Sequence, residues 1–255
     1  MKYFDLHFHP TTKSFLSDEN IRLKKSPWKT MTVLGIDNIF GDILDSQSSL
    51  SQILKGNVVL GVATIVPMEI GFAKSGLIRK VIPIISPLDR DFVTKIKDGK
   101  FSYWELFNGE LHFLKKSLEG QSRVKILNSI GEIDESRINL ILGIEGGHSF
   151  MGGKGPLKNL VDLKKSKHNF LYITLTHLTD IGENYLANHA YGQKLINELE
   201  FIPGRYALSK LGKEFIGLCY DRAKGNPILI DIKHMSLRAR QEFYKLRKEK
   251  NYNDP

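Results

Sequence analysis

The chain is poor in cysteine and in long apolar runs. Its 255 residues contain one cysteine, Cys219, so no disulfide can form within the chain. We therefore expect a reducing compartment, which predicts a cytoplasmic protein. No window of about 18 uninterrupted apolar residues is present, and the first ten residues, MKYFDLHFHP, lack the apolar segment of a signal peptide. The sequence thus excludes a small disulfide-stapled domain and predicts no membrane-spanning helix.

The chain has fewer acidic than basic residues. Lysine and arginine together number 37, against 28 for aspartate and glutamate, which gives a formal net charge of +9. The basic residues are scattered over helix-like segments, and no basic stripe interleaved with aromatic residues is present. We interpret them as solvated helix faces and expect no nucleic-acid partner.

The chain also lacks internal repeats and low-complexity linkers, which predicts a single domain over residues 1–255. Short apolar runs alternate with longer helical patterns, and this favours βα units built around a parallel sheet. Near-continuous valine, isoleucine and leucine in these runs is typical of strands that are buried on both faces. The runs expected to form strands are 3–8, 58–67, 138–147, 170–177 and 227–234.

Amphipathic periodicity predicts the helices. They are expected over 103–120, 156–167, 209–224 and 237–250. For the third of these, Ser209 is placed to cap the amino end and Gly225 to end the helix in the left-handed conformation. Residues 80–89 are interpreted either as a strand or as an extended loop.

Histidines and a glutamate stand where the expected strands end. His7 and His9 are two residues apart at the end of the first run, so they project to the same side and can reach one ion. Glu145 comes near the end of the third run, and His177 and His234 close the fourth and fifth. In a parallel α/β barrel the carboxyl ends of the strands face one rim, where active sites are built. Imidazole and carboxylate suit zinc and related divalent metals, so we expect a metal site there.

Each of these signals has a less specific interpretation. A lone histidine is more often a hydrogen-bonded or surface residue than a ligand, and His-x-His alone is a weak indication of a metal. Glu145 is more telling, because a carboxylate on a buried strand is costly unless it is paired or bound to a metal. Gly146 and Gly147 after it allow the backbone to turn tightly or to approach a ligand. The combination indicates a metal centre.

Four segments occur in a specific series along the second half of the chain. They are LGIEGGHSF (142–150), LYITLTH (171–177), LSKLGKEFI (208–216) and ILIDIKHMS (228–236). The series resembles the membrane (renal) dipeptidase family of the amidohydrolase superfamily. The resemblance is good over 140–236 and loose at the first strand. It implies an α/β fold of the (β/α)8 TIM-barrel type, of which this chain carries about five βα units.

The resemblance also implies a centre of two metal ions, usually zinc, although other divalent metals are possible. His7 and His9 correspond to ligands of the first metal ion. Glu145 corresponds to the carboxylate that bridges both ions, and His234 to a ligand of the second. His148 does not correspond to a ligand, and we interpret it as a loop residue behind the site.

The activity that this family implies is hydrolysis of a dipeptide or a related small amide, in which a metal-activated hydroxide attacks the carbonyl. His177 corresponds to the histidine that contacts the substrate and stabilises the oxygen of the tetrahedral intermediate, so it is our catalytic candidate. The loop over 182–192 follows it, and we expect this loop, with Asn184, to bind substrate.

Two departures from the family pattern stand out. The dipeptidases carry His-x-Asp on the first strand, whereas this chain carries His-x-His, which removes one negative charge. No histidine follows His234, and Asp254 is the only acidic residue after Glu249. The strand-6 histidine and the strand-8 aspartate of the family are therefore not recognisable. We expect a completing C-terminal segment, a second chain or a homo-oligomer to close the sheet, since open strand edges invite pairing.

Two alternatives remain open at this stage. The first is another amidohydrolase, of the phosphoesterase or nuclease type, which also uses His-x-His on the first strand. The second is a non-catalytic module that kept the fold without the general base.

Overall fold

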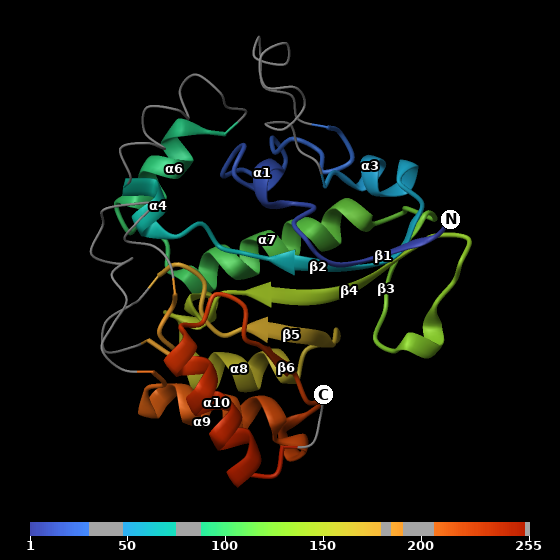
Figure 1. The fold of residues 1–255 in the computed structure, drawn as a ribbon. Helices are drawn as coiled ribbons and strands as arrows, with labels where there is room; N and C mark the ends of the chain where they lie inside the picture. Colours follow the sequence, from blue (N-terminus) through green and yellow to red (C-terminus); the bar gives the residue numbers. More distant parts are fainter. Residues whose placement is uncertain (31–47, 75–87, 180–184, 191–206, 253–255) are drawn as a thin grey trace. The chain divides into compact units, whose positions relative to one another are not determined.

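The computed structural model describes residues 1–30, 48–74, 88–179, 185–190 and 207–252 (Figure 1). The chain divides into two compact units. The first comprises Met1–Phe101 and Phe107–Gly143, and the second comprises Ser102–Leu106 and Ile144–Pro255. The expectation of a single domain stays a prediction.

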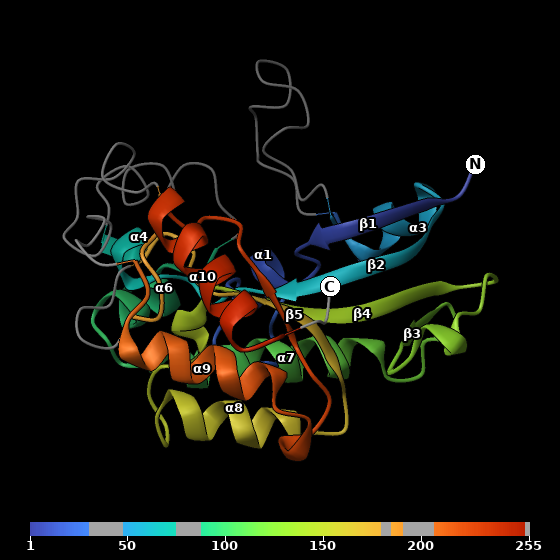
Figure 2. The ribbon, with the colours of Figure 1, turned by 60° about the horizontal axis from the view of Figure 1, so that its bottom comes forward.

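The first unit is built on parallel strands. They are β1 (Tyr3–Phe8), β2 (Val58–Ile65), β3 (Val124–Ile126) and the greater part of β4 (Ile138–Glu145). β1 pairs with β2, β2 pairs with β4, and β3 pairs with the beginning of β4. β1 and β2 lie side by side and run in the same direction, as Figure 2 shows. Gly61 in β2 makes room for Phe8, because a Cβ on Gly61 would lie 2.4 Å from the Phe8 ring.

Helices and turns of the first unit follow these strands along the chain. They are α1 (Thr12–Phe15), α3 (Leu50–Lys55), α4 (Ile70–Lys74), α6 (Arg90–Lys97), most of α7 (Tyr103–Leu118) and the 3-10 turn η2 (Ile130–Glu132). Their starts follow local capping chemistry. Ser49 and Gln52 form a capping box at α3, and the Asp89 side chain accepts a hydrogen bond from the Phe92 backbone N–H at α6.

An aromatic cluster occupies the core of the first unit on the helix side. The Phe15 ring meets the Phe92 ring edge-on at 5.7 Å and the Phe113 ring at 6.2 Å between centroids. The buried Lys24 ammonium lies 4.2 Å from the centre of the Phe15 ring and donates a hydrogen bond to the Phe15 carbonyl. Burial lowers the pKa of Lys24 to about 8, because the protein core solvates an ammonium group less well than water.

The second unit begins with the end of β4. It continues with η3 (Gly147–Phe150), α8 (Pro156–Lys164), β5 (Phe170–Thr174), α9 (Lys210–Tyr220), η6 (Arg222–Lys224), β6 (Leu229–Asp231) and α10 (Leu237–Glu249). β5 and β6 pair in parallel, with Thr174 opposite Asp231. α8 and α9 lie side by side in both ribbon views (Figures 1 and 2). Phe150 and Phe215 pack edge-on between η3 and α9, with centroids 4.9 Å apart.

Within each unit, successive strands of the main path are parallel and adjacent in chain order. That order is characteristic of a (β/α)8 barrel, whereas a doubly wound sheet reverses its strand order at a switch point. The predicted fold class is therefore confirmed, and the five predicted runs correspond to β1, β2, β4, β5 and β6. The short β3 was not predicted, and 80–89 lies mostly outside the described residues.

Two boundaries differ from the sequence expectation. The strands end earlier than the apolar runs, so β5 stops at Thr174 and β6 at Asp231. The helix predicted to run to Gly225 is wrong at its end, because α9 stops at Tyr220 and a separate 3-10 turn fills the interval. The Asp221 side chain accepts from the Ala223 backbone N–H, which starts that turn.

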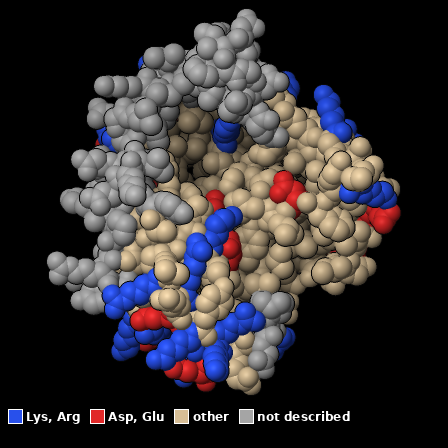
Figure 3. All heavy atoms as spheres, in the orientation of Figure 1, with Lys and Arg blue, Asp and Glu red and all other residues tan. Residues whose placement is uncertain are grey.

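Charges of both signs alternate on the surface of the second unit. Figure 3 shows basic side chains interspersed with acidic ones over the region where α9 and α10 lie in Figure 1. α10 itself, LRARQEFYKLRKE, buries Ala239 and Phe243 and carries its charges around them. In the part of the chain that the structure describes, no helix is both long and apolar enough to cross a bilayer.

Candidate metal centre

The first unit holds the two histidines of the first strand as a pair. β1 ends at Phe8, and the Nε2 atoms of His7 and His9 lie 3.1 Å apart, with the two rings edge-on. Two nitrogen ligands at 2.0–2.1 Å from a tetrahedral zinc ion lie about 3.3 Å apart, so the observed spacing fits a shared ion. The alternation of a strand explains why the two rings share one side.

His9 is oriented by the neighbouring strand. Its Nδ1 lies 2.9 Å from the backbone carbonyl oxygen of Thr64, near the end of β2. A carbonyl only accepts hydrogen bonds, so the proton of His9 sits on Nδ1 and the lone pair on Nε2 faces His7. A histidine ligand held in this way by a carbonyl is the usual arrangement in metal sites, because the hydrogen bond fixes tautomer and ring direction.

A buried carboxylate supports the turn that follows His9. Glu110 of α7 accepts hydrogen bonds from the hydroxyls of Thr11 and Thr12, each at 2.9 Å. Burial raises the pKa of Glu110 to about 7, and the two hydroxyls oppose this shift by stabilising the charged form. The sequence interpretation missed Glu110, because nothing in a helical pattern marks which polar residue faces the core.

The second unit presents the predicted carboxylate. Glu145 is the last residue of β4, and its side chain is 6% exposed. The chain then turns sharply at Gly146, where φ is +91°, and the Gly146 backbone N–H bonds to the Thr174 carbonyl at 3.0 Å. A Cβ on Gly146 would lie 2.2 Å from the His148 ring, so only glycine fits between them. The backbone thus aims Glu145 by means of the glycine that the sequence singled out.

Two histidines join Glu145 in this unit. The Nε2 atom of His234 lies 3.2 Å from Glu145 Oε1, and the His177 and His234 rings meet edge-on with centroids 4.6 Å apart. One ligand atom from each of Glu145, His177 and His234 lies within 4.8 Å of the others. The Glu145 carboxylate and the His234 imidazole are donors that zinc favours, so these two residues fit the ion that the resemblance implies, and His177 lies beside them.

His234 has an unusual backbone. Its φ is +67°, in the left-handed region, which costs a non-glycine residue about 1–2 kcal/mol. The conformation is held by the segment 185–190, because the Ala190 N–H bonds to the His234 carbonyl at 2.7 Å and the Ser236 N–H to the Asn188 carbonyl at 2.8 Å. Strain of this kind is often retained where a side chain must point in a functional direction.

A lysine that the sequence interpretation overlooked stands beside the carboxylate. Lys233 Nζ is 3.6 Å from Glu145 Oε1 and 3.7 Å from Asp231 Oδ2. Asp231 in turn accepts from the Thr174 hydroxyl at 2.7 Å and from the Lys233 backbone N–H at 2.9 Å. The position of Lys233 directly before His234, in the sequence IDIKH, was a signal that could have identified this lysine.

Of the remaining candidates, the structure describes His148 but not Asn184. Asn184 lies outside the described residues, and so does part of the loop over 182–192. His148 is buried in η3 with its ring edge-on to Tyr103, 4.8 Å between centroids, which agrees with a place behind the site. His7 and His9 belong to the first unit, whereas Glu145, His177 and His234 belong to the second. That the two groups serve one centre stays a prediction.

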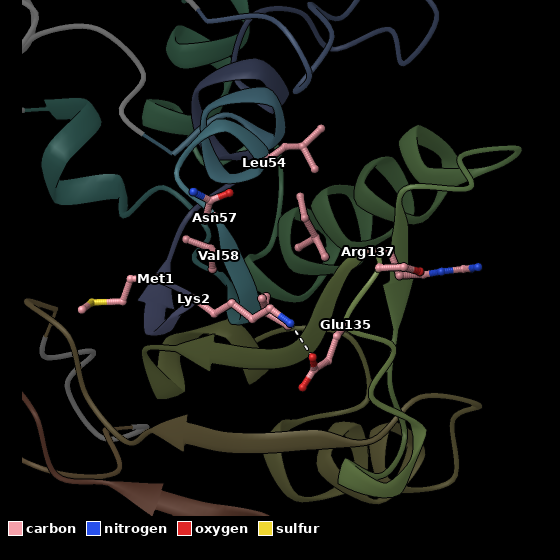
Figure 4. A pocket seen from close by; sticks show the side chains of 10 residues that line it. Met1, Lys2, Leu54, Asn57, Val58, Glu135 and Arg137 are labelled. Carbon is pink, nitrogen blue, oxygen red and sulfur yellow. Dashed lines mark hydrogen bonds and ion pairs between the residues drawn. The ribbon is translucent and has the colours of Figure 1, made fainter.

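One further pocket lies away from these residues. A cavity of about 380 Å³ in the first unit is lined by residues near the amino ends of β1, β2 and β4 (Figure 4). Lys2 and Glu135 form an ion pair across it. His7 lies in the carboxyl-terminal half of β1 and His9 directly follows the strand, so this pocket is not part of the candidate centre.

Comparison with known proteins supports the fold. No family model matches the chain, and no curated protein matches its sequence. A probable dipeptidase, PvdM, from Pseudomonas aeruginosa has a similar solved structure, with a TM-score of 0.53 and 14% identity over 78% of this chain and 43% of that chain. Dipeptidase AC, described as a metallopeptidase of family M19, gives a TM-score of 0.50 and 12% identity over 96% of this chain and 60% of that chain.

The chain thus spans between 43% and 60% of the length of these two structures. At such low identity the likeness concerns the fold. The chain has the fold of these dipeptidase structures, and the resemblance to the renal dipeptidase family that its sequence carries is confirmed at that level.

Proposed function

We propose that this chain forms the metal-binding part of a hydrolase that cleaves peptide or related small amide bonds. The observation that carries the proposal is the Glu145–His177–His234 cluster, whose ligand atoms lie within 4.8 Å of one another beyond the ends of parallel strands. The likeness of the fold to dipeptidase structures supports the same reading.

In this proposal the residues have two roles, as metal ligands and as a donor to the substrate oxygen. His7 and His9 would hold one divalent ion, Glu145 and His234 would hold a second, and Glu145 would serve both. Zinc in such a site polarises a carbonyl and lowers the pKa of a bound water toward neutrality. His177 donates a hydrogen bond to the oxygen on which negative charge develops, and so lowers the barrier to attack. The substrate is a dipeptide or a related amide.

Metal content tests the first half of the proposal. We expect the protein purified without chelator to carry zinc or another divalent ion, measured by inductively coupled plasma mass spectrometry. His234→Ala should weaken zinc binding by more than about 100-fold, because even the partners behind ligands change affinity by 10–100-fold. His112→Ala is the matched control, since His112 is an exposed histidine on α7. Wild-type protein that binds no divalent ion would falsify the metal role.

A substrate panel tests the second half. Dipeptides and a phosphodiester are offered to the zinc-loaded protein, and we expect release of amino acids with no cleavage of the phosphodiester. His177→Ala should lower kcat for dipeptides by about 100-fold or more, the usual effect of removing one oxyanion donor, and leave zinc content unchanged. Cleavage of the phosphodiester alone would favour the phosphoesterase alternative. Bound metal without any hydrolysis would favour a non-catalytic module.

A further inference from the structure

Among the residues that the structure describes, Lys233 places a cationic side chain next to the candidate metal ligands. Its ammonium group and the His234 ring contact the same oxygen, Glu145 Oε1, at 3.6 and 3.2 Å. A carboxylate as buried as that of Glu145 needs a positive or hydrogen-bonding partner, because its loss of hydration is otherwise uncompensated. In this arrangement Lys233 supplies the positive charge.

A metal ion on Glu145 would have the Lys233 ammonium group as a like-charged neighbour. A zinc ion that bound Glu145 Oε1 at 2.0–2.2 Å and an ammonium group 3.6 Å from the same oxygen would lie no more than about 5.8 Å apart. Two cations at that distance in a partly buried site repel each other strongly. The Lys233 ammonium group therefore opposes binding of the ion as long as it stays beside Glu145, and binding favours its movement away.

The surroundings provide a second position for the ammonium group. Asp231 Oδ2 lies 3.7 Å from Lys233 Nζ, and the Asp231 carboxylate is held by the Thr174 hydroxyl and by the Lys233 backbone N–H. The Lys233 side chain is 40% exposed and has a flexible stem, so its Nζ can move from one carboxylate toward the other.

We infer that Lys233 competes with a divalent metal ion for Glu145 and thereby sets the metal affinity of the Glu145–His177–His234 cluster. The inference rests on the proposed function, because it takes this cluster to be metal-binding. The competition makes occupancy of this position depend on the free metal concentration, whereas a small residue in place of Lys233 would allow the ion to bind without displacing a charge.

Zinc titration of matched variants tests the inference. Lys233→Ser should bind zinc at this cluster at least about tenfold more tightly than the wild type, since removing a nearby like charge favours the ion. Lys233→Arg keeps the charge and should stay within about twofold of the wild type. Lys213→Ser is the control, because Lys213 is a lysine of α9 that pairs with Glu242. Affinity is measured by competition with a chromophoric chelator, and the ¹⁵N chemical shifts of the His234 imidazole show that this cluster is the one filled.

The outcomes separate the inference from the proposed function. Equal and tight binding by wild type and Lys233→Ser would overturn the inference and leave the proposed function standing. A gain in affinity that survives the additional change His234→Ala would also overturn it, because the tighter site would then lie elsewhere. Absence of zinc binding at Glu145 and His234 in every variant would overturn both. Lys233→Met preserves the aliphatic stem and replaces the serine variant if that protein does not fold, as judged by circular dichroism.

Discussion

At the scale of single residues, Gly146 is what permits Glu145 to end a strand and face a site. Its φ of +91° and the His148 ring, 2.2 Å from where a Cβ would stand, exclude any side chain. The sequence indicated a special backbone conformation at Gly146, because two glycines after a buried carboxylate allow a tight turn or a close approach to a ligand. It gave no sign that His148 fills the space above it.

We predict that Gly146→Ala destabilises the protein by about 2–4 kcal/mol and weakens zinc binding. The backbone strain accounts for about 1 kcal/mol, and the clash with the His148 ring accounts for the rest. Gly155→Ala is the matched control, because Gly155 has a φ of +92° and nothing within 4 Å of a built Cβ. Urea unfolding measures both variants, and equal loss in the two would show that the clash with His148 is not real.

Lys233 shows what a single sequence does not reveal at this scale. His234 was predicted because a histidine closing an apolar run is conspicuous. The lysine before it resembles any other basic residue in a chain with a net charge of +9. Its importance depends on the 3.6 Å distance to Glu145, which is 88 residues away in the chain and is brought near by β4, β5 and β6.

At the scale of elements, the end of α9 is fixed by a side chain from another helix. The Lys164 ammonium group at the end of α8 donates hydrogen bonds to three backbone carbonyls: Leu218 at 2.7 Å, Cys219 at 2.9 Å and Asp221 at 2.8 Å. Leu218 and Cys219 are in the last turn of the helix and Asp221 directly follows it, where the regular helical hydrogen bonds end. This tertiary contact explains why α9 stops at Tyr220 and not at the glycine that the local pattern favoured.

We predict that Lys164→Met lowers the free energy of unfolding by about 2–3 kcal/mol. The change leaves three partly buried carbonyls without their charged donor, and hydrogen bonds from charged groups are worth about 1.5–3 kcal/mol. Lys165→Met, at the exposed neighbouring position, should change stability by less than about 0.5 kcal/mol. Chemical denaturation of the two variants side by side measures the difference. A similar small loss in both would rule out a capping role for Lys164.

The strands were predictable as elements because five apolar runs, all but the first rich in β-branched residues, stand apart from amphipathic stretches. β3 was not, because VKI is three residues long and owes its strand conformation to pairing with the start of β4. The early ends of β5 and β6 likewise reflect pairing with each other, which no run of apolar letters records.

At the scale of the whole molecule, burial of an ionisable group makes stability depend on pH. Glu110 has a pKa of about 7 in the fold and an ordinary value of 4.5 when exposed, so the folded state holds its proton more tightly. Its contribution is fully present below pH 4.5 and is lost as the pH rises toward 7, because the folded chain must then ionise a buried group.

We predict that the wild type loses up to about 3 kcal/mol of this contribution between pH 4.5 and 7, which corresponds to 1.4 kcal/mol for each unit of pKa difference. Glu110→Gln keeps an acceptor for Thr11 and Thr12 but cannot ionise. Urea unfolding at a series of pH values, with a chelator present, should show a shallower decline for the variant across this interval. Parallel curves for the two proteins would mean that Glu110 is ionised in the fold throughout.

The sequence by itself determined the fold class and the identity of the candidate ligands. Apolar periodicity reports which segments are buried, and histidine or glutamate at the ends of those segments is chemically conspicuous. Only the tertiary structure decided the partners: the Thr64 carbonyl behind His9, the His148 ring over Gly146, the lysine that ends α9, and the ammonium group beside Glu145. Hydrogen bonds and ion pairs act over a few ångströms in space, and residues that meet at that range are separated in the chain by whole βα units.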